Sequence, residues 1–104
     1  MGRFDRRVAV ITGAARGIGF GIARRFASEG ASIAILDLDE SAAQEAAGRL
    51  ELTDGARAIG VGCDVVDSAA AEAAVQRVVE ELVGIHILVN NAGVTRDNLL
   101  FKMT

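Results

Sequence analysis

Glycines follow a run of small apolar residues near the start of the chain, in the segment VAVITGAARGIG from Val8 to Gly19. Gly13 and Gly17 precede the last glycine of this segment, and an amphipathic helical pattern begins directly after them. Glycines let a ligand approach the backbone, and a helix N-terminus offers unpaired N–H groups and partial positive charge. On its own the turn fits two interpretations, a phosphate-binding loop or a tight connection between strand and helix. Its G-x-x-x-G-x-G spacing also differs from the commonest dinucleotide fingerprint.

An acidic residue stands where a dinucleotide site needs one. Asp37 ends the second apolar run, Ser32–Leu36, about 20 positions after the glycine turn. A carboxylate there can accept hydrogen bonds from both ribose hydroxyls of an adenosine and repels a 2′-phosphate. The alternative is that Asp37 only begins the turn into the next helix. Together, the glycine turn, the helix start and the acid favour the dinucleotide interpretation.

The apolar periodicity predicts strands that alternate with helices along the whole chain. The expected strands are Val8–Ile11, Ser32–Leu36, Ala56–Gly62 and Ile85–Val89. The expected helices run from Ile18 to Gly30, from Asp39 to Leu50 and from Asp67 or Ser68 to Gly84, and a further helix begins at about Asn98. Ser41 with Gln44 is a second candidate cap for the helix after Asp39.

This alternation predicts an α/β fold with parallel strands and right-handed crossovers, as a single domain over residues 1–104. We expect a Rossmann-type sheet with helices on both faces and the strand order 3-2-1-4, which is the N-terminal half of such a sheet. The switch point then lies between the first and fourth strands. The glycine turn and the segment NNAG, Asn90 to Gly93, should flank one crevice there.

The spacing of apolar residues also predicts which helix faces are buried. In the first helix Ile18, Ile22 and Phe26 recur at four-residue steps with Ala23 and Ala27 beside them, and Gly21 suggests close packing against a strand. In the third helix the expected inner stripe is Val75, Val78, Val79 and Leu82.

Composition excludes several classes of function. The 104 residues include 51% hydrophobic and only 4% aromatic residues, and the formal net charge of −3 gives no basic footprint for nucleic acid. No apolar stretch reaches about 18 residues and no signal peptide is apparent, so we expect no membrane span and a cytoplasmic protein. Cys63, the only cysteine, cannot form an internal disulfide and is interpreted as a small buried residue. His86 is interpreted as a strand-start residue.

Two motifs resemble those of the short-chain dehydrogenases/reductases. Thr12 and Gly13 through Gly19 match that family's T-G-x-x-x-G-[IL]-G turn, with Gly17 and Ile18 at the expected places. NNAG matches its second signature at the end of the fourth strand. The resemblance covers the chain from Val8 onward and implies a Rossmann-type fold, a nicotinamide cofactor, a small-molecule substrate and a homo-oligomer.

The resemblance also implies roles for individual residues. The glycine turn would hold the pyrophosphate, and Thr12 would brace this turn against NNAG. Asp64 and Val65 would flank the adenine. The nucleotide crevice would be lined by Asn90, Ala92 and Gly93. From the residues alone, Asp64 could instead initiate a helix, and Asn90 with Asn91 could be a simple turn pair.

Two residues give opposite indications about the cofactor. Arg16 occupies a position where family members that use NADPH often carry a basic residue, whereas Asp37 is typical of those that use NADH. Repulsion of a 2′-phosphate about 4 Å from Asp37 is worth a few kcal/mol at an effective dielectric near 20. An exposed arginine contact contributes about 1 kcal/mol or less. We therefore expect NAD, with NADP retained as an alternative because of Arg16.

The segment from Val94 to Met103, VTRDNLLFKM, is similar to the same region of 3-oxoacyl-acyl-carrier-protein reductases. This similarity implies a 3-oxoacyl thioester as substrate, with another ketone or secondary alcohol as the alternative. The expected NAD preference departs from the NADPH habit of those reductases.

Family members reduce a carbonyl with a tyrosine, a lysine four positions later and a serine. This sequence contains no tyrosine, and Lys102 is its only lysine. We therefore expect the nucleotide-binding half of an oxidoreductase, inactive alone and prone to associate through an unpaired fourth strand. The alternatives are a non-catalytic NAD-binding module and a purely structural fragment.

Overall fold

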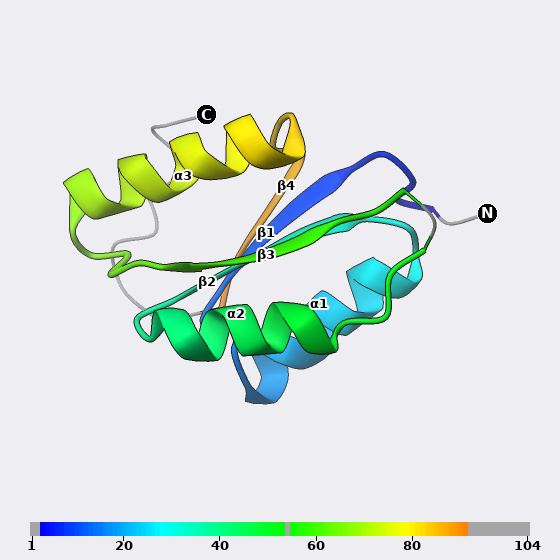
Figure 1. The fold of residues 1–104 in the computed structure, drawn as a ribbon, viewed down its shortest axis with the longest axis horizontal. Helices are drawn as coiled ribbons and strands as arrows, with labels where there is room; N and C mark the ends of the chain where they lie inside the picture. Colours follow the sequence, from blue (N-terminus) through cyan, green and yellow to red (C-terminus); the bar gives the residue numbers. More distant parts are fainter. Residues whose placement is uncertain (1–2, 54, 92–104) are drawn as a thin grey trace.

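The computed structural model describes residues 3–53 and 55–91 (Figure 1). Its strands are β1 (Val8–Thr12), β2 (Ser32–Asp37), β3 (Ala58–Gly62) and β4 (Ile87–Asn90). All neighbouring strands are parallel and lie in the order β3-β2-β1-β4. The predicted strand order is therefore confirmed.

The helices that connect these strands cover both faces of the sheet (Figure 1). They are α1 (Gly17–Ser28), α2 (Glu40–Arg49) and α3 (Ser68–Leu82). Helices α1 and α2 lie on one face and α3 on the other, and each face has its own apolar cluster. The predicted Rossmann-type arrangement is confirmed.

Strand β1 belongs to both clusters because successive side chains point to opposite faces. Ala9 and Ile11 pack with α1 and α2, whereas Val8 and Val10 pack on the side of α3. Every residue of β1 is buried. This explains why the strand reads as a continuous apolar run rather than as an alternating one.

The first turns of α2 and α3 are each capped by an aspartate. Asp39 accepts a hydrogen bond from the N–H of Ala42, and Asp67 accepts from those of Ala69 and Ala70. These caps decide between the alternatives left by the sequence, because Asp39 rather than Ser41 precedes α2 and Asp67 rather than Ser68 precedes α3. Each cap satisfies N–H groups that the helix itself cannot pair.

The predicted buried face of α1 is partly wrong. Ile18 is 79% exposed, whereas Ala23 and Ala27 are buried as predicted, together with Gly19. Small residues on this face let the helix axis lie close to the sheet. The prediction for Gly21 is also wrong, since a Cβ atom added there would meet no atom within 4 Å.

Close helix packing occurs instead at Gly60, where a Cβ atom would overlap the backbone of Ala43 in α2. The stripe predicted for α3 also needs a correction, because Val79 is 39% exposed. The buried residues of α3 are Ala71, Ala74, Val78 and Leu82. In α3, Ala71 and Ala74 complete a buried face of which the hydropathy pattern indicated only Val78 and Leu82 correctly.

Strands β3 and β4 begin two residues later than predicted, at Ala58 and Ile87. Before β4, His86 pairs with Val8 through two hydrogen bonds. Its backbone N–H donates to the Val8 carbonyl oxygen, and its Nδ1 accepts from the Val8 N–H, each over 2.9 Å. The imidazole therefore takes the place of a backbone acceptor at the start of the β1–β4 ladder.

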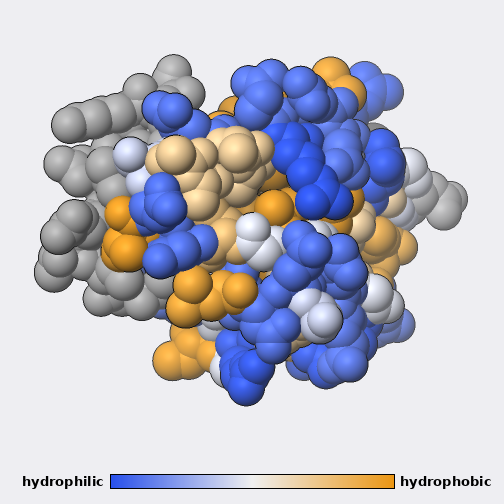
Figure 2. Space-filling view, turned by 60° about the vertical axis from the view of Figure 1, so that its left-hand side comes forward, coloured by the Kyte–Doolittle hydropathy of each residue, from blue (hydrophilic) through white to orange (hydrophobic). Residues whose placement is uncertain are grey.

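The surface near the carboxyl ends of the strands mixes apolar patches with hydrophilic residues (Figure 2). The exposed large apolar side chains include Ile18, Leu38 and Val66. Among the described residues, no helix has both the length and the apolar character needed to cross a bilayer. Within the same residues, no cluster of histidine, cysteine and carboxylate side chains could hold a metal ion.

Candidate functional site

A pocket of about 340 Å³ lies at the carboxyl ends of β1, β2 and β3. Because parallel strands all end at one edge of the sheet, the loops that follow them meet there. The pocket is lined by Gly13, Leu36, Asp37, Leu38, Cys63, Asp64, Val65, Val66 and Asn91. It brings together four predicted site residues from three different loops, which are Gly13, Asp37, Asp64 and Val65.

Glycine is required at the three positions of the turn for different structural reasons. Gly13 and Gly17 have left-handed backbone conformations, with φ of 63° and 65°. Residues other than glycine rarely adopt this conformation. A Cβ atom at Gly19 would overlap the side chain of Asn91 and the carbonyl oxygen of Gly13. The first two glycines therefore shape the turn, and the third lets α1 lie against the ends of β1 and β4.

The N-terminus of α1 differs from those of the other helices. Arg16 occupies the N-cap position in an extended conformation, and none of the described side chains forms a capping hydrogen bond there. No acidic residue lies in the first turn. The first N–H groups of α1 and the positive end of its dipole thus need an acceptor from elsewhere, such as an anion.

Thr12 joins the end of β1 to the end of β4. Its side chain is fully buried, and its hydroxyl donates to Oδ1 of Asn90 and accepts from the N–H of Asn91, each over 3.0 Å. The side chain of Asn91 in turn donates to the carbonyl oxygen of Gly13 over 3.2 Å. These bonds form the brace between the glycine turn and β4 that the sequence motifs imply.

Asp37 closes β2 beside the pocket. Its carboxylate accepts a hydrogen bond from the N–H of Asp39 over 3.3 Å, and its carbonyl oxygen accepts from the N–H of Cys63 over 2.7 Å. The second bond fixes the end of β3 against the end of β2. The carboxylate of Asp37 is only partly buried, so it remains accessible to a ligand in the pocket.

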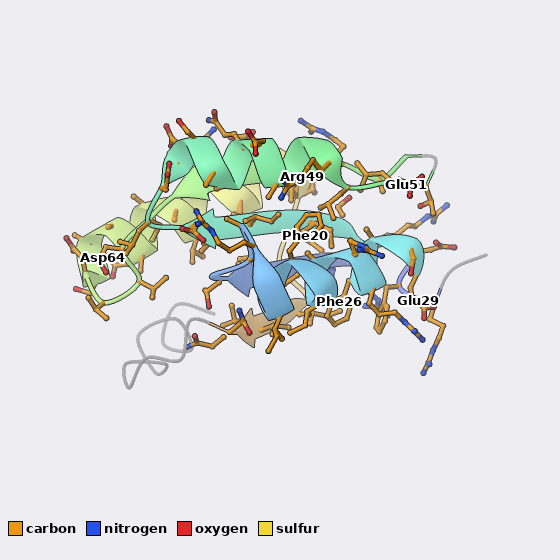
Figure 3. The ribbon with its side chains drawn as sticks, turned by 90° about the horizontal axis from the view of Figure 1, so that it is seen from below. Phe20, Phe26, Glu29, Arg49, Glu51 and Asp64 are labelled. Atoms are coloured by element: carbon orange, nitrogen blue, oxygen red, sulfur yellow. The ribbon has the colours of Figure 1, made fainter. Side chains whose placement is uncertain are left out.

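Asp64 lies in the loop that follows β3, far from Phe26 and Glu29 at the opposite end of the molecule (Figure 3). Its carboxylate accepts from the N–H of Val66 over 3.1 Å and so stabilises this turn. The alternative that Asp64 initiates α3 is wrong, because Asp67 is the cap.

Cys63 is 6% exposed and contributes to the pocket wall. Burial raises the pKa of its thiol, and the negative charges of Asp64 and Asp67 raise it further. The thiol is therefore neutral near pH 7 and is not an activated nucleophile. This confirms its interpretation as a small buried residue.

The remaining predicted residues lie around the pocket rather than in its lining. Gly17, Ile18 and Gly19 form the first turn of α1, and Arg16 is exposed at the N-cap. Thr12 and Asn90 form the brace. Ala92 and Gly93, and the helix predicted at Asn98, lie outside the described residues.

Sequence reasoning missed part of the pocket wall. From the sequence, Asn91 has no role beyond membership of NNAG and of a turn pair, yet its side chain donates to the Gly13 carbonyl oxygen, adjoins Gly19 and lines the pocket. Its place inside NNAG was the available signal. Leu38 and Val66 were not singled out at all, and at 76% and 41% exposure they supply apolar surface at the pocket rim.

Comparison with known proteins gives a consistent result. The sequence model of the family described as short chain dehydrogenase matches residues 7–104. D-threitol dehydrogenase of Mycolicibacterium smegmatis is 47% identical over 94 residues, which cover 90% of this chain and 36% of that protein. A 3-oxoacyl-[acyl-carrier-protein] reductase of Chlamydia muridarum is 41% identical over 98 residues, which cover 94% of this chain and 40% of that protein.

The fold is similar to that of a hydroxysteroid dehydrogenase from Escherichia coli. The TM-score is 0.79 at 36% identity, and the match covers 88% of this chain and 37% of the other. The chain thus spans 36–40% of the length of these relatives. With the glycine turn, the strand order and the family match in agreement, the chain belongs to the short chain dehydrogenase family.

Proposed function

We propose that this chain is the NAD-binding part of an oxidoreductase that interconverts a carbonyl and a hydroxyl group. The observation that carries the proposal is the pocket at the carboxyl ends of β1 to β3, which adjoins a helix N-terminus without a cap from the described side chains. An acidic residue at the end of β2 and an anion-binding turn after β1 are the two groups that a dinucleotide requires.

The residues present fit such a cofactor. The unpaired N–H groups of α1 would receive the diphosphate, and Asp37 would accept hydrogen bonds from the adenosine ribose. Leu38, Val65 and Val66 offer apolar surface to a flat base, and the pocket volume falls within the usual range for ligand sites. When bound, the nicotinamide supplies or accepts the hydride, and this chain's residues hold and orient the nucleotide.

The proposed preference for NAD follows from where the two opposing residues lie. Asp37 lines the pocket, whereas Arg16 is exposed at the N-cap of α1 and does not line it. A 2′-phosphate would therefore approach the carboxylate closely, while its contact with the arginine would be screened by water.

This preference is tested by titrating the natural-length protein, meaning the complete gene product, with NADH and NADPH while cofactor fluorescence is recorded. We expect NADH to bind at least about tenfold more tightly, since a few kcal/mol separate the two cofactors. Asp37→Ser should reduce or reverse the preference, and Arg16→Ala should leave it nearly unchanged. Tighter binding of NADPH by the unaltered protein would overturn the assignment.

For the substrate we propose a 3-oxoacyl thioester, on the strength of the segment Val94–Met103 and of the acyl-carrier-protein reductase among the relatives. A sugar alcohol is the second candidate, because D-threitol dehydrogenase is similar to this chain at comparable identity. Two assays of the natural-length protein distinguish them: oxidation of NADH in the presence of a 3-oxoacyl thioester, and reduction of NAD⁺ in the presence of a sugar alcohol. Binding without turnover of either would favour a non-catalytic NAD-binding module.

We further propose that the groups which donate the proton lie outside these 104 residues, since the sequence has no tyrosine. A cytoplasmic homo-oligomer completes the proposal and rests on the family resemblance. Sedimentation equilibrium of the natural-length protein measures its oligomeric state, and cell fractionation its location.

A further inference from the structure

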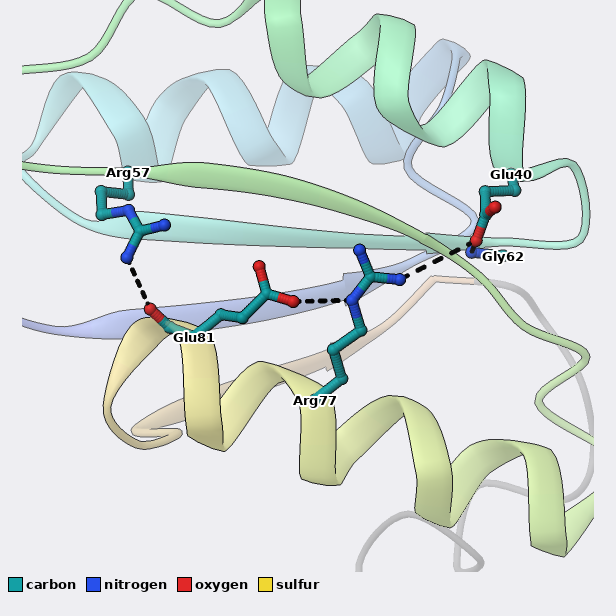
Figure 4. A network of polar contacts seen from close by, with 5 residues as sticks. All are labelled: Glu40, Arg57, Gly62, Arg77 and Glu81. Atoms are coloured by element: carbon teal, nitrogen blue, oxygen red, sulfur yellow. Dashed lines mark hydrogen bonds and ion pairs between the residues drawn. The ribbon is translucent and has the colours of Figure 1, made fainter.

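A side chain from α2 reaches the outer edge of the sheet. Oε1 of Glu40, the first residue of α2, accepts a hydrogen bond from the N–H of Gly62 over 3.3 Å (Figure 4). Gly62 ends β3, the outermost strand on that side. The next N–H, that of Cys63, donates to Asp37 in β2, so the N–H of Gly62 points away from the sheet, where no strand of the described residues can pair with it.

An arginine from α3 forms an ion pair with this carboxylate. Nη1 of Arg77 lies 3.9 Å from Oε1 of Glu40, and its Nε donates to Glu81 over 2.7 Å. Arg57, just before β3, donates to the backbone carbonyl oxygen of Glu81 over 2.8 Å. Figure 4 shows these contacts as one network that links α2, β3 and α3 across the open edge of the sheet.

Glu40 and Gly62, at one end of this network, adjoin the two walls of the candidate nucleotide pocket in the sequence. One wall is formed by Asp37 and Leu38, which precede Glu40 in the chain, and the other begins at Cys63, which follows Gly62. Gly62 has no room for a side chain, because a Cβ atom there would lie 2.6 Å from Cβ of Glu40. The bond from Gly62 to Glu40 is therefore a second link between the two walls, outside the backbone bond that joins Cys63 to Asp37.

We propose that Glu40, oriented by Arg77, is a positioning residue that, together with the backbone bond from Cys63 to Asp37, holds these two walls at the separation that binds the adenosine half of the nucleotide. The inference rests on the proposed function of the pocket. Glu40 and Arg77 do not line the pocket, so they act through Asp37, Leu38 and the loop that starts at Cys63. Because both charges are more than a third exposed, their pairing weakens as salt is added.

The test measures dissociation constants of the natural-length protein for NADH, AMP and nicotinamide mononucleotide. Glu40→Ala removes both the bond to Gly62 and the exposed pair with Arg77, and should weaken NADH and AMP binding about threefold to fivefold. Glu40→Gln keeps an oxygen that can accept from Gly62 and should lose only about twofold, as should Arg77→Met. Binding of nicotinamide mononucleotide should not change.

The matched control is Glu45→Gln, on the same helix. Glu45 pairs with Arg49 over 3.4 Å, away from Gly62 and from the pocket lining, so the control removes an equivalent charge without touching either wall. We expect it to bind NADH as the unaltered protein does. Addition of about 0.5 M NaCl should weaken AMP binding less in Glu40→Ala than in the unaltered protein, because only the latter still has the pair to screen.

The outcomes are distinguishable. Unchanged AMP affinity in Glu40→Ala, an equal loss in Glu45→Gln, or an equal loss for nicotinamide mononucleotide would each overturn the positioning role. If Glu40→Ala does not fold, Glu40→Gln and Arg77→Met carry the test. If the unaltered protein binds neither NADH nor AMP, the proposed function fails, and the inference with it.

Discussion

At the start of α3, the carboxylate of Asp67 accepts hydrogen bonds from two backbone N–H groups, whereas at the start of α1 no described side chain does so. The two helices lie on opposite faces of one sheet and follow strands that end at the same edge. A capping side chain contributes about 1 kcal/mol to stability. The chain lacks this contribution at α1, where an exposed arginine precedes the helix and a glycine begins it. The first N–H groups of α3 are therefore used by the fold, whereas those of α1 are available to a ligand.

The largest effect is expected where α1 packs against β1 and β4. Gly19→Ala introduces a Cβ atom that overlaps Asn91 and the backbone at Gly13. We expect the free energy of unfolding to fall by about 1–3 kcal/mol and NADH binding to be lost. Gly21→Ala on the same helix meets open space and should stabilise the protein by up to about 1 kcal/mol with binding retained. Urea unfolding and NADH titration measure both, and equal effects at the two glycines would contradict this packing.

The contrast between the starts of α1 and α3 is tested by giving α1 a capping side chain. Arg16→Asp places a carboxylate at the N-cap, which should raise the free energy of unfolding by about 1 kcal/mol. The same carboxylate would occupy the N–H groups and repel a diphosphate, so NADH affinity should fall more than about tenfold. Arg16→Ala is the control for loss of the arginine alone. Full NADH affinity in Arg16→Asp would show that the diphosphate binds elsewhere.

A smaller effect is expected when the cap of α3 is removed. Asp67→Ala leaves the N–H groups of Ala69 and Ala70 without their acceptor and should cost about 1 kcal/mol in unfolding free energy. Because Asp67 does not line the pocket, NADH affinity should be unchanged once the protein is folded. A loss of affinity comparable to that in Arg16→Asp would remove the distinction between the two helix starts.

The strand order and the place of Asp37 could be predicted because parallel strands buried on both faces appear as continuous apolar runs with an acid at their end. The buried face of α1 could not be predicted in full. The spacing placed Ala23 and Ala27 on this face correctly, but hydropathy also favoured Ile18, whereas the close approach of the helix to the sheet buries Gly19 instead. The bond between Glu40 and Gly62 joins residues 22 positions apart and has no local sequence signal.

The pairing of His86 with Val8 has a consequence for how the protein folds. These residues are 78 positions apart, as are Thr12 and Asn90, so β4 can join the sheet only after most of the chain has been closed into a loop. Such closure carries an entropic cost that contacts within α1, α2 and their neighbouring strands do not incur. Strand β4 should therefore be the last to dock, and the wall that contains Asn91 completes the pocket only at that step.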